Sequence, residues 1–427
     1  MRFDTRLVQV GQEPDQETGD VVPAIHVATT YERRTQNPLR YFYARSENPT
    51  REALERCLAS LEDARFAMVF PSGQSAAATV LTLLEPGQRL ISSDDVYGGI
   101  YNLFSTLRRY DIEVDYVDLT DIATLDAALG YDVGMVWIET PTNPMLKVID
   151  LAAVHHCVRQ NRGWIVVDNT LAGPALQQPL RFGADVTLYS STKSIAGHSD
   201  VLGGALVYND EELHHAFSSH RATVGSVPGA LDCFLVHRGL KTLSLRTSRQ
   251  VSNASQIAAE LHSLARVGKL ARVGTVNYPG LADHPQHQVA MNQMSGPGSV
   301  LSFEYLDDPG KLFERLKLFT YAVSLGGVRS LIERPATMTH ASIPLASRKK
   351  LGISDNLIRL SAGIEDPSDL LEDLLAALLA GATWPPPRSG PVGYRRPGLP
   401  ATRRISANQP HQCGITPYTT SSPLIRR

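Results

Sequence analysis

The amino-acid sequence predicts an α/β protein whose larger part is a mostly parallel β-sheet covered by helices. From Phe66 onward, seven short apolar runs alternate with helical patterns, which is typical of a parallel sheet with crossover helices. After Asp232 a long helical stretch leads into a mixture of strand-like runs and amphipathic helices, which predicts a second, smaller α+β domain. The length of 427 residues suits two such domains with appendages.

The larger domain is expected to hold a seven-stranded sheet. Its predicted strands are residues 66–70, 89–93, 112–118, 133–139, 164–169, 184–190 and 201–208. Helical patterns lie between them at residues 75–84, 100–110 and 150–160. Another helix is expected at 51–63, with Thr50 as its N-cap because a threonine side chain can accept hydrogen bonds from the first turn.

The pattern divides the chain into four segments. Residues 1–50 contain many turn formers and are expected to form an N-terminal arm, and residues 51–264 the large domain. Residues 265–383 are expected to form the α+β domain, with strands at 299–306 and 357–364 and helices at 309–319 and 369–381. The segment 384–427 has nine of the 27 prolines, seven arginines and no Asp, Glu or Lys, so we expect it to be disordered.

Composition argues against several classes of protein. The formal net charge of -2 gives no reason to expect nucleic acid or another polyanion as a partner. No long apolar run suggests a transmembrane span. The first residues also lack the apolar stretch of a secretory signal. We therefore expect a soluble enzyme or binding protein of the cytoplasm that acts on a small molecule.

The cysteines and histidines do not predict a metal site. Four scattered cysteines form no C-x-x-C pair and are expected to be reduced thiols of a cytoplasmic protein: Cys57, Cys157, Cys233 and Cys413. Asp283, His284 and His287 cluster in one loop, but nothing else in the sequence supplies a convincing ligand set.

The most informative stretch is ADVTLYSSTKSIAGHSD, residues 184–200. Its predicted strand runs into hydroxyl residues, including Ser190 and Thr192, that are followed directly by Lys193. Burial lowers the pKa of an amine because it disfavours the charged form, which makes a lysine usable as nucleophile and base. The hydroxyl groups suit a phosphate. Taken alone, S-x-T-K is a weak motif, and a structural lysine is the commoner explanation.

Two further features point to the same kind of site. Asp168 ends a hydrophobic strand, where open α/β sheets bind ligands, although alone it could equally be a turn former or a helix cap. Ser72, Gly73 and Gln74 precede a helix whose free N–H groups and dipole suit a phosphate, although alone they could be an ordinary turn. Together with Lys193 they supply a phosphate cradle, an amine and a partner for a ring nitrogen, which predicts a pyridoxal-phosphate (PLP) site.

The chain resembles the Cys/Met-metabolism PLP enzymes, a family that includes cystathionine γ-lyases, cystathionine γ-synthases and methionine γ-lyases. The resemblance spans about residues 5–381 and rests on the motifs YFYARSENPTR, SGQSAA, DDVYGG, IETPTNP, VVDNT, SSTKSIAGHSDVLGG, SLGG, MTHAS and GISDNLIRLSAGIED. It implies the type I fold of PLP-dependent transferases, like that of aspartate aminotransferase. It also implies a homotetramer, a dimer of dimers whose subunits share active sites.

The resemblance carries cofactor-binding roles onto particular residues. It implies that Lys193 holds PLP as a Schiff base and that Asp168 faces the pyridinium nitrogen. Tyr97 resembles the tyrosine that stacks on the cofactor ring and handles protons in catalysis. The remaining implied cofactor-binding residues are Ser72, Gly73, Gln74, Ser190, Thr192, Tyr43 and Arg45. Within the family, the last two belong to a Y-x-R motif that reaches the phosphate of the neighbouring subunit.

The resemblance also implies a substrate site and a reaction. Arg359 resembles the arginine that forks onto the substrate carboxylate, a geometry that lysine does not reproduce, with Asn143 and Ser324 nearby. The implied reaction is γ-elimination: the substrate amine displaces Lys193, the freed lysine removes the Cα proton, and loss of a Cβ proton expels the γ-substituent. Acting on cystathionine, this reaction gives cysteine, 2-oxobutanoate and ammonia.

Three alternatives stay open. One is γ-replacement on an O-acylhomoserine, as in cystathionine γ-synthases and homocysteine-forming sulfhydrylases. Another is methionine γ-lyase activity. The third, from a different class, is a PLP-binding protein that has lost catalysis and acts as a regulatory subunit; the intact set of Lys193, Asp168, Tyr97 and Arg359 argues against it.

Four positions bear on the choice of substrate. Phe42 and Val323 are apolar where cystathionine-handling members commonly have acidic residues, and in this they resemble methionine γ-lyases. Gly99 stands where methionine γ-lyases usually have cysteine, and Arg329 stands where the family normally has glutamate. The wider segments DDVYGG, DCFLVHRGLKTL and MTHAS resemble cystathionine γ-lyases most, so the leading prediction is a cystathionine γ-lyase-like enzyme.

Overall fold

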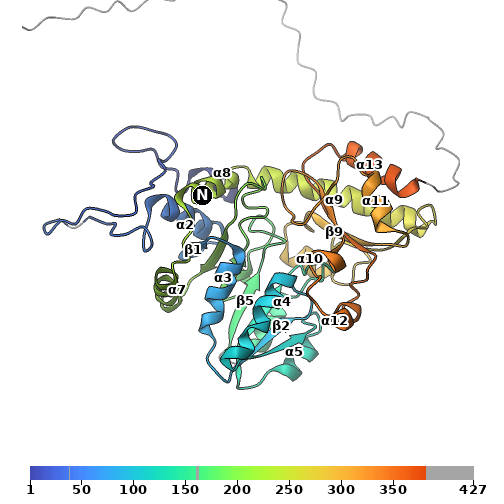
Figure 1. The fold of residues 1–427 in the computed structure, drawn as a ribbon, viewed down its shortest axis with the longest axis horizontal. Helices are drawn as coiled ribbons and strands as arrows, with labels where there is room; N and C mark the ends of the chain where they lie inside the picture. Colours follow the sequence, from blue (N-terminus) through green and yellow to red (C-terminus); the bar gives the residue numbers. More distant parts are fainter. Residues whose placement is uncertain (38, 160–162, 381–427) are drawn as a thin grey trace, which may run out of the picture. The chain divides into compact units, whose positions relative to one another are not determined.

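A computed structural model describes residues 1–37, 39–159 and 163–380 of the chain (Figure 1). The described residues all belong to one compact unit. The predicted disordered tail, residues 384–427 with Cys413, lies outside them. The division of the chain predicted at residues 50, 264 and 383 stays a prediction.

The first sheet confirms the expected α/β fold. In the described chain it has seven strands in the order β1-β7-β6-β5-β4-β2-β3. Neighbouring strands from β3 to β6 are parallel, whereas β7 is antiparallel to both β1 and β6. Each predicted strand contains one observed strand: Phe66–Phe70 (β1), Arg89–Ser93 (β2), Glu113–Val117 (β3), Val133–Glu139 (β4), Trp164–Asp168 (β5), Val186–Tyr189 (β6) and Gly204–Tyr208 (β7).

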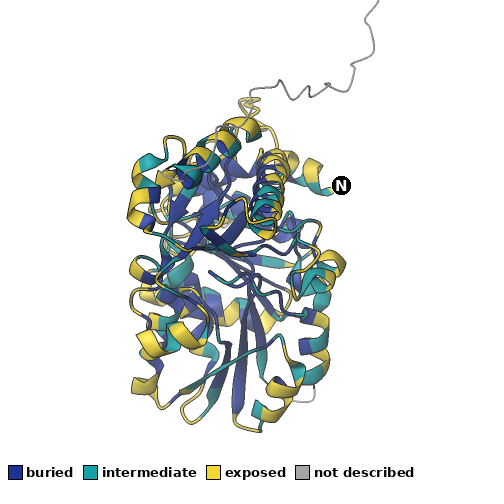
Figure 2. Cartoon of the chain, turned by 90° about the vertical axis from the view of Figure 1, so that its right-hand side faces the viewer, coloured by how far each residue is buried: buried dark blue, intermediate teal, exposed yellow. Residues whose placement is uncertain are grey.

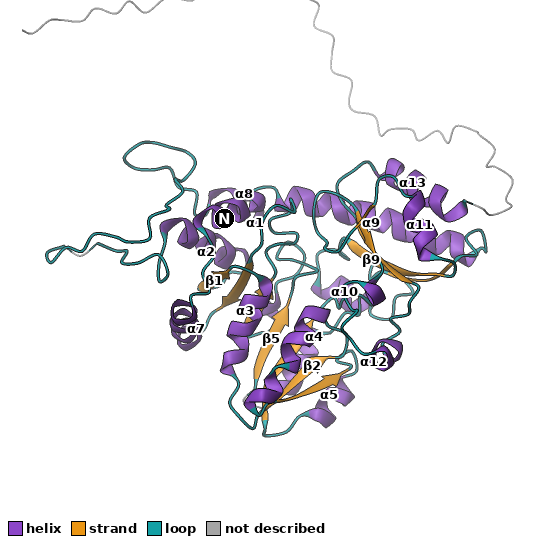
Figure 3. Cartoon of the chain, viewed as in Figure 1, coloured by secondary structure: helices purple, strands orange, loops and turns teal. Residues whose placement is uncertain are grey.

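Helices cover both faces of this sheet (Figure 3). Successive side chains of a strand point to opposite faces. In β4, Met135 and Trp137 therefore pack with α3 and α4, whereas Val136 and Ile138 pack with α5 and α6. The helices are Pro49–Leu61 (α2), Gly73–Val80 (α3), Gly98–Ser105 (α4), Ile122–Ala128 (α5), Leu151–Val158 (α6), Glu211–Val224 (α7) and Ala230–Leu240 (α8).

The N-terminal region differs from the prediction in two details. A short helix, α1 (Phe3–Gln9), was not predicted, and its Leu7 is buried. The N-cap of α2 is Asn48 and not Thr50, because Pro49 starts the helix and the Asn48 side chain accepts the Arg51 N–H at 3.1 Å. The Thr50 hydroxyl instead accepts the N–H of His26 at 2.9 Å.

A second sheet follows, with the order β10-β11-β12-β9-β8. Its strands are Val273–Asn277 (β8), Val300–Tyr305 (β9), Thr320–Tyr321 (β10), Leu331–Glu333 (β11) and Leu357–Ser361 (β12). The helices of this region are Leu243–Arg266 (α9), His287–Gln293 (α10), Pro309–Arg315 (α11), Leu345–Lys350 (α12) and Pro367–Leu379 (α13). Of these five strands only β9 and β12 were predicted from the sequence, because the others are short or carry little apolar patterning.

The second sheet has its own core. Phe303 of β9 and Ile358 of β12 pack with Ile257 of α9 and Leu374 of α13. Figure 2 shows buried residues along the strands of both sheets and exposed residues on the outer sides of the helices. None of the helices among the described residues combines the length and the apolar character needed to cross a membrane.

Two features of the fold bring residues together at one edge of the first sheet. Strands β4 and β5 are in register so that their last residues, Glu139 and Asp168, lie directly opposite each other. At Gly204 of β7, a Cβ atom would lie 2.2 Å from the carbonyl oxygen of Ser72. Glycine at this position therefore lets the turn before α3 lie directly against the sheet.

Candidate active site

A cavity of about 220 Å³ lies at the carboxyl ends of β4, β5 and β6. It brings together predicted site residues from distant parts of the chain: Ser72, Gly73, Gln74, Tyr97, Asn143, Asp168, Ser190, Thr192, Lys193, Ser324 and Arg359. Tyr43 and Arg45 do not line it. The predicted place of this pair is the active site of a neighbouring subunit, and that expectation, like the chemical role of each residue in the cavity, stays a prediction.

Lys193 occupies the turn that follows β6. Its backbone N–H donates to the Ser190 carbonyl at 3.1 Å, and its Nζ donates to the Ser324 hydroxyl at 3.0 Å. Burial, and after it the nearby positive charge of Arg359, lower the pKa of the Lys193 amine to about 8, although the negative charge of Glu333 acts in the opposite direction. An amine of this kind is partly neutral near physiological pH, so it can act as a nucleophile and accept a proton.

Two carboxyl groups, Asp168 and Glu139, lie side by side in the cavity. Burial raises the pKa of both, and the negative charge of Asp168 raises the pKa of Glu139 further. Asp168 Oδ1 accepts the N–H of Thr170 at 3.0 Å, and Glu139 Oε2 accepts the N–H of Tyr97 at 2.9 Å. Glu139 Oε1 is buried without a hydrogen-bond partner among the described residues. Glu139 was not predicted from the sequence, although it is the glutamate of the motif IETPTNP.

The pair fits the ring of the expected cofactor. When two carboxyl groups are buried side by side, ionisation of both is unfavourable unless a positive charge lies nearby. Such a site therefore favours a cationic N–H donor beside the carboxyl groups. A protonated pyridine nitrogen is such a donor. The orphaned Glu139 oxygen and the raised pKa values therefore agree with a PLP ring bound near Asp168.

The start of α3 has features that suit the predicted phosphate cradle. The Ser72 side chain caps the helix by accepting the Ser75 N–H at 3.1 Å, which leaves the N–H groups of the first turn directed at the helix entrance. A Cβ atom on Gly73 would lie 2.9 Å from Ser190 Cβ, so glycine allows these two segments to meet. The Thr192 hydroxyl is already bonded to the backbone of Gly203, donating at 3.2 Å and accepting at 2.9 Å.

Arg359 of β12 forms the opposite wall. Its Nη1 donates to Asn143 Oδ1 at 2.9 Å, and its Nη2 donates to the Ser324 carbonyl at 2.8 Å. Its Nε is buried without a partner among the described residues, so the guanidinium keeps a free donor. Ser324 has a φ of 94°, a strained conformation for a residue with a side chain. In that conformation its carbonyl faces Arg359 and its hydroxyl faces Lys193.

Tyr97 lies at the start of α4 with 40% of its surface exposed, on the wall of the cavity. Gly99 explains how close this ring comes to the helix: a Cβ there would lie 2.4 Å from both Tyr97 Cε1 and Gln74 Nε2. Methionine γ-lyases usually have cysteine at the position of Gly99. A cysteine side chain there would collide with Tyr97 in its present position.

Tyr43 and Arg45 lie in another part of the chain. They line a different surface cavity together with residues 227–231, and the Arg45 guanidinium lies 5.6 Å from the centre of the Tyr43 ring. Phe42 is exposed and does not line the PLP cavity, whereas Val323 lines it. Arg329 is exposed on the surface.

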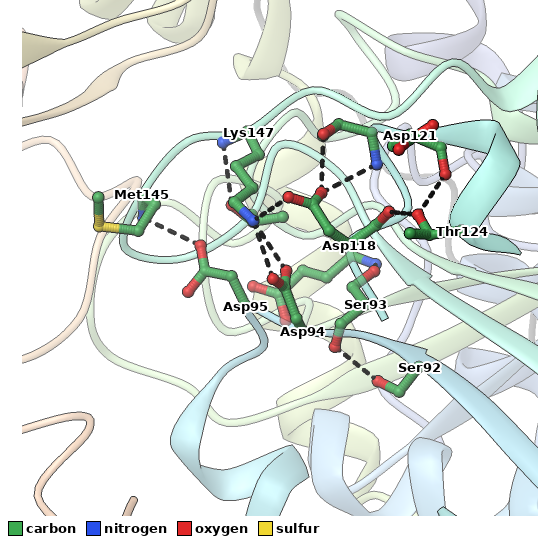
Figure 4. A network of polar contacts seen from close by, with 12 residues as sticks. Ser92, Ser93, Asp94, Asp95, Asp118, Asp121, Thr124, Met145 and Lys147 are labelled. Carbon is green, nitrogen blue, oxygen red and sulfur yellow. Dashed lines mark hydrogen bonds and ion pairs between the residues drawn. The ribbon is translucent and has the colours of Figure 1, made fainter. Parts of the chain in front are cut away.

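The loop that carries Asn143 is held in place by a polar network (Figure 4). Lys147 Nζ donates to both oxygens of Asp94 and to Asp118 Oδ2, each at 3.0 Å. The buried Asp95 accepts the Met145 N–H at 3.1 Å. These contacts tie the loop to the ends of β2 and β3 and thereby fix the position of Asn143.

No set of three or more His, Cys, Asp or Glu residues suited to a metal ion occurs in the described parts of the chain.

A PLP-dependent enzyme is the class of protein that this cavity fits. Comparison with known proteins agrees: residues 4–379 match the family described as Cys/Met metabolism PLP-dependent enzymes. The chain belongs to this family, and its cofactor is PLP.

Individual relatives are similar over most of their length. The chain is 44% identical to a cystathionine beta-lyase of Coxiella burnetii and to a cystathionine gamma-lyase of Dictyostelium discoideum, each over 88% of this chain and 97% of the relative. It is 57% identical to CalE6 of Micromonospora echinospora, whose crystal structure superimposes with a TM-score of 0.85 over 89% of this chain and 100% of CalE6. CalE6 is described as a cystathionine gamma-lyase in that structure and as a methionine gamma-lyase in a second one.

The pKa of Lys193 leads to a test of its reactivity. Since only the neutral amine attacks the aldehyde of PLP, and the pKa of Lys193 is lowered to about 8, neutral amine accumulates as the pH rises toward 8. The rate at which cofactor-free protein recombines with PLP should rise about tenfold per pH unit below pH 8 and level off above it. Stopped-flow absorbance measures this rate. Nα-acetyl-lysine serves as control, and a protein rate that keeps rising to pH 10 would contradict the assignment.

Proposed function

We propose that the protein is a carbon–sulfur lyase that carries out γ-elimination on a sulfur amino acid, with cystathionine as the leading substrate. The observation that carries this proposal is the position of Ser324 between two groups. Its hydroxyl accepts from Lys193 Nζ, while its carbonyl accepts from Arg359 Nη2. An amino acid whose carboxylate binds Arg359 is thereby placed with its α-carbon toward the Lys193 amine.

In this proposal, different side chains have different roles in the reaction. When bound, PLP withdraws electrons from the bonds at Cα and Cβ of an amino acid joined to it. Lys193 Nζ accepts the Cα proton, for which its lowered pKa suits it. Asp168 and Glu139 would hold the proton of the cofactor ring nitrogen, and the N-terminus of α3 with Ser190 would hold the phosphate. Tyr97, on the cavity wall, is the candidate for proton transfer at the departing sulfur.

The choice between cystathionine and methionine rests on the rim of the cavity. Val323 lines the cavity and is 51% exposed, so an apolar γ-substituent has an apolar surface to contact. That observation favours methionine as a second candidate, and the two descriptions of CalE6 agree with it. The names of the Dictyostelium and Coxiella relatives and the wider sequence motifs favour cystathionine. With cystathionine, water completes the reaction to cysteine, 2-oxobutanoate and ammonia.

We also propose that the enzyme is a homotetramer whose active sites include Tyr43 and Arg45 of a neighbouring subunit. Both residues lie away from the Lys193 cavity of their own chain, and the surrounding arm exposes Phe42 at 55% and Val27 at 79%. Apolar surface of this kind is normally covered in an assembly. A cytoplasmic location is supported by the unpaired cysteines Cys57, Cys157 and Cys233.

A substrate panel tests the proposed reaction. Purified holoenzyme should release cysteine and 2-oxobutanoate from cystathionine with a higher kcat/KM than it releases methanethiol from methionine. Lys193→Ala should lower kcat by about a thousandfold or more, because it removes the group that accepts the Cα proton. Turnover of O-acetylhomoserine only, and only when cysteine or sulfide is added, would contradict the lyase proposal in favour of γ-replacement.

Subunit mixing tests the shared site. Arg45→Ala and Lys193→Ala, each nearly inactive alone, should regain activity when co-expressed, because a hybrid dimer has one site with both native residues. Random pairing predicts recovery to about a quarter of the wild-type activity. Asp168→Ala with Lys193→Ala is the matched control and should give no recovery, since both residues line the cavity of one chain. No recovery for Arg45→Ala either would contradict a shared site.

A further inference from the structure

The arginine on the substrate side of the cavity is already paired with a buried carboxylate. Glu333 of β11 lies directly opposite Arg359 of β12 in the antiparallel register. Glu333 Oε1 and Arg359 Nη1 are 3.0 Å apart, and the two side chains are 1% and 2% exposed. The resemblance stated above assigns no role to Glu333, and it does not line the cavity itself.

In this ion pair, only some of the polar atoms of the two side chains have hydrogen-bond partners. Glu333 Oε1 also accepts the Thr339 hydroxyl at 2.7 Å, so one oxygen fixes the orientation of the carboxylate. Glu333 Oε2 and Arg359 Nε are both buried without a partner among the described residues. The pair therefore holds Arg359 in place while one donor of the guanidinium and one acceptor of the carboxylate remain unused.

Binding of a substrate changes the charge balance around this pair. In the free enzyme the positive charge of Arg359 is neutralised by Glu333. A substrate carboxylate at Arg359 adds a second negative charge in the same buried region, and an unpaired buried charge is costly. Protonation of Glu333 removes that excess charge, and burial already raises the pKa of its carboxyl group.

Other charged groups facing the pair do not replace Glu333 in this role. Lys193, after β6, is the remaining cation near Glu333 and is itself partly neutral at physiological pH. His340 is buried, and burial lowers its pKa to about 4, so it stays neutral. Glu139 and Tyr97 also lie near Arg359, and neither carries a positive charge.

We propose that Glu333 is a positioning and specificity residue that takes up one proton from solvent when a substrate carboxylate binds Arg359 and releases it when the product leaves. The proposal rests on the proposed function, because it takes Arg359 as the carboxylate site. The proton goes to Oε2, the oxygen without a partner, while Oε1 keeps its bonds to Arg359 and Thr339. Affinity for amino-acid carboxylates is thereby coupled to pH through a residue that does not touch the substrate.

The coupling has a measurable consequence for any carboxylate at this site. Binding that takes up a full proton weakens about tenfold for each unit of rising pH. Glu333→Gln keeps the acceptor for Arg359 and Thr339 at nearly the same size but leaves the guanidinium charge uncompensated. This variant should therefore bind carboxylates more tightly and independently of pH.

The test uses 3-(methylthio)propionate, a carboxylate that lacks the amine needed to react with PLP. Titration calorimetry of the holoenzyme at pH 7–9, in buffers of different ionisation enthalpy, gives both affinity and proton uptake. Wild type should take up close to one proton. Glu333→Gln should take up none and bind about tenfold or more tightly at pH 8. Glu62→Gln is the matched control: it removes another buried carboxyl group, which accepts from Tyr189 and Thr187 and not from Arg359, and it should keep the wild-type proton uptake.

Each outcome decides the proposal. Absence of proton uptake by the wild-type enzyme overturns it, whether or not the variants fold. Equal affinity and equal uptake in wild type and Glu333→Gln also overturn it. Arg359→Leu should lose binding of the probe, and retained binding would place the carboxylate elsewhere and overturn the proposal too. Failure of the lyase proposal is seen separately, as absence of thiol release from cystathionine and methionine by wild-type enzyme.

Discussion

The burial of Lys193 in one cavity with a pair of buried carboxyl groups is the constraint on which the rest of the active site depends. Parallel strands bring their carboxyl ends to one edge of the sheet, so the last residues of β4 and β5, Glu139 and Asp168, become neighbours there. The turn after β6 then places Lys193 in the same cavity. Burial lowers the pKa of the lysine and raises those of the acids, which gives a reactive amine and a site for a cationic ring.

The second sheet supplies the other half of the site. Its strand β12 presents Arg359, and the strained Ser324 links this arginine with Lys193 through its carbonyl and its hydroxyl. In the proposed reaction, the substrate carboxylate and the reacting amine are thus positioned by one residue. Glu333, across the strand pair from Arg359, compensates the guanidinium charge in a region that excludes water. Charge compensation at Arg359 therefore depends on a residue outside the cavity wall, whereas its orientation also depends on Ser324, which lines the cavity.

Much of this arrangement could be predicted from the sequence, for physical reasons. The seven strands were visible because parallel strands buried on both faces are continuous apolar runs. Lys193 and Asp168 were visible because charged residues at the ends of such runs are unusual. Glu139 and Glu333 were missed because their significance comes from register: each matters only through the residue opposite it on the next strand. In the proposal, Tyr43 and Arg45 contribute to the active site of a neighbouring subunit. The structure of one chain therefore does not bring them to the Lys193 cavity.

The central claim is that Lys193 is the residue that holds the cofactor, and one measurement tests it directly. Borohydride reduction fixes PLP covalently to the amine that carries it, and peptide mass spectrometry then identifies that residue. The account predicts that the phosphopyridoxyl group is found on Lys193 and on no other lysine of the chain. A label on a different lysine, or a reduced protein without any label, would contradict it.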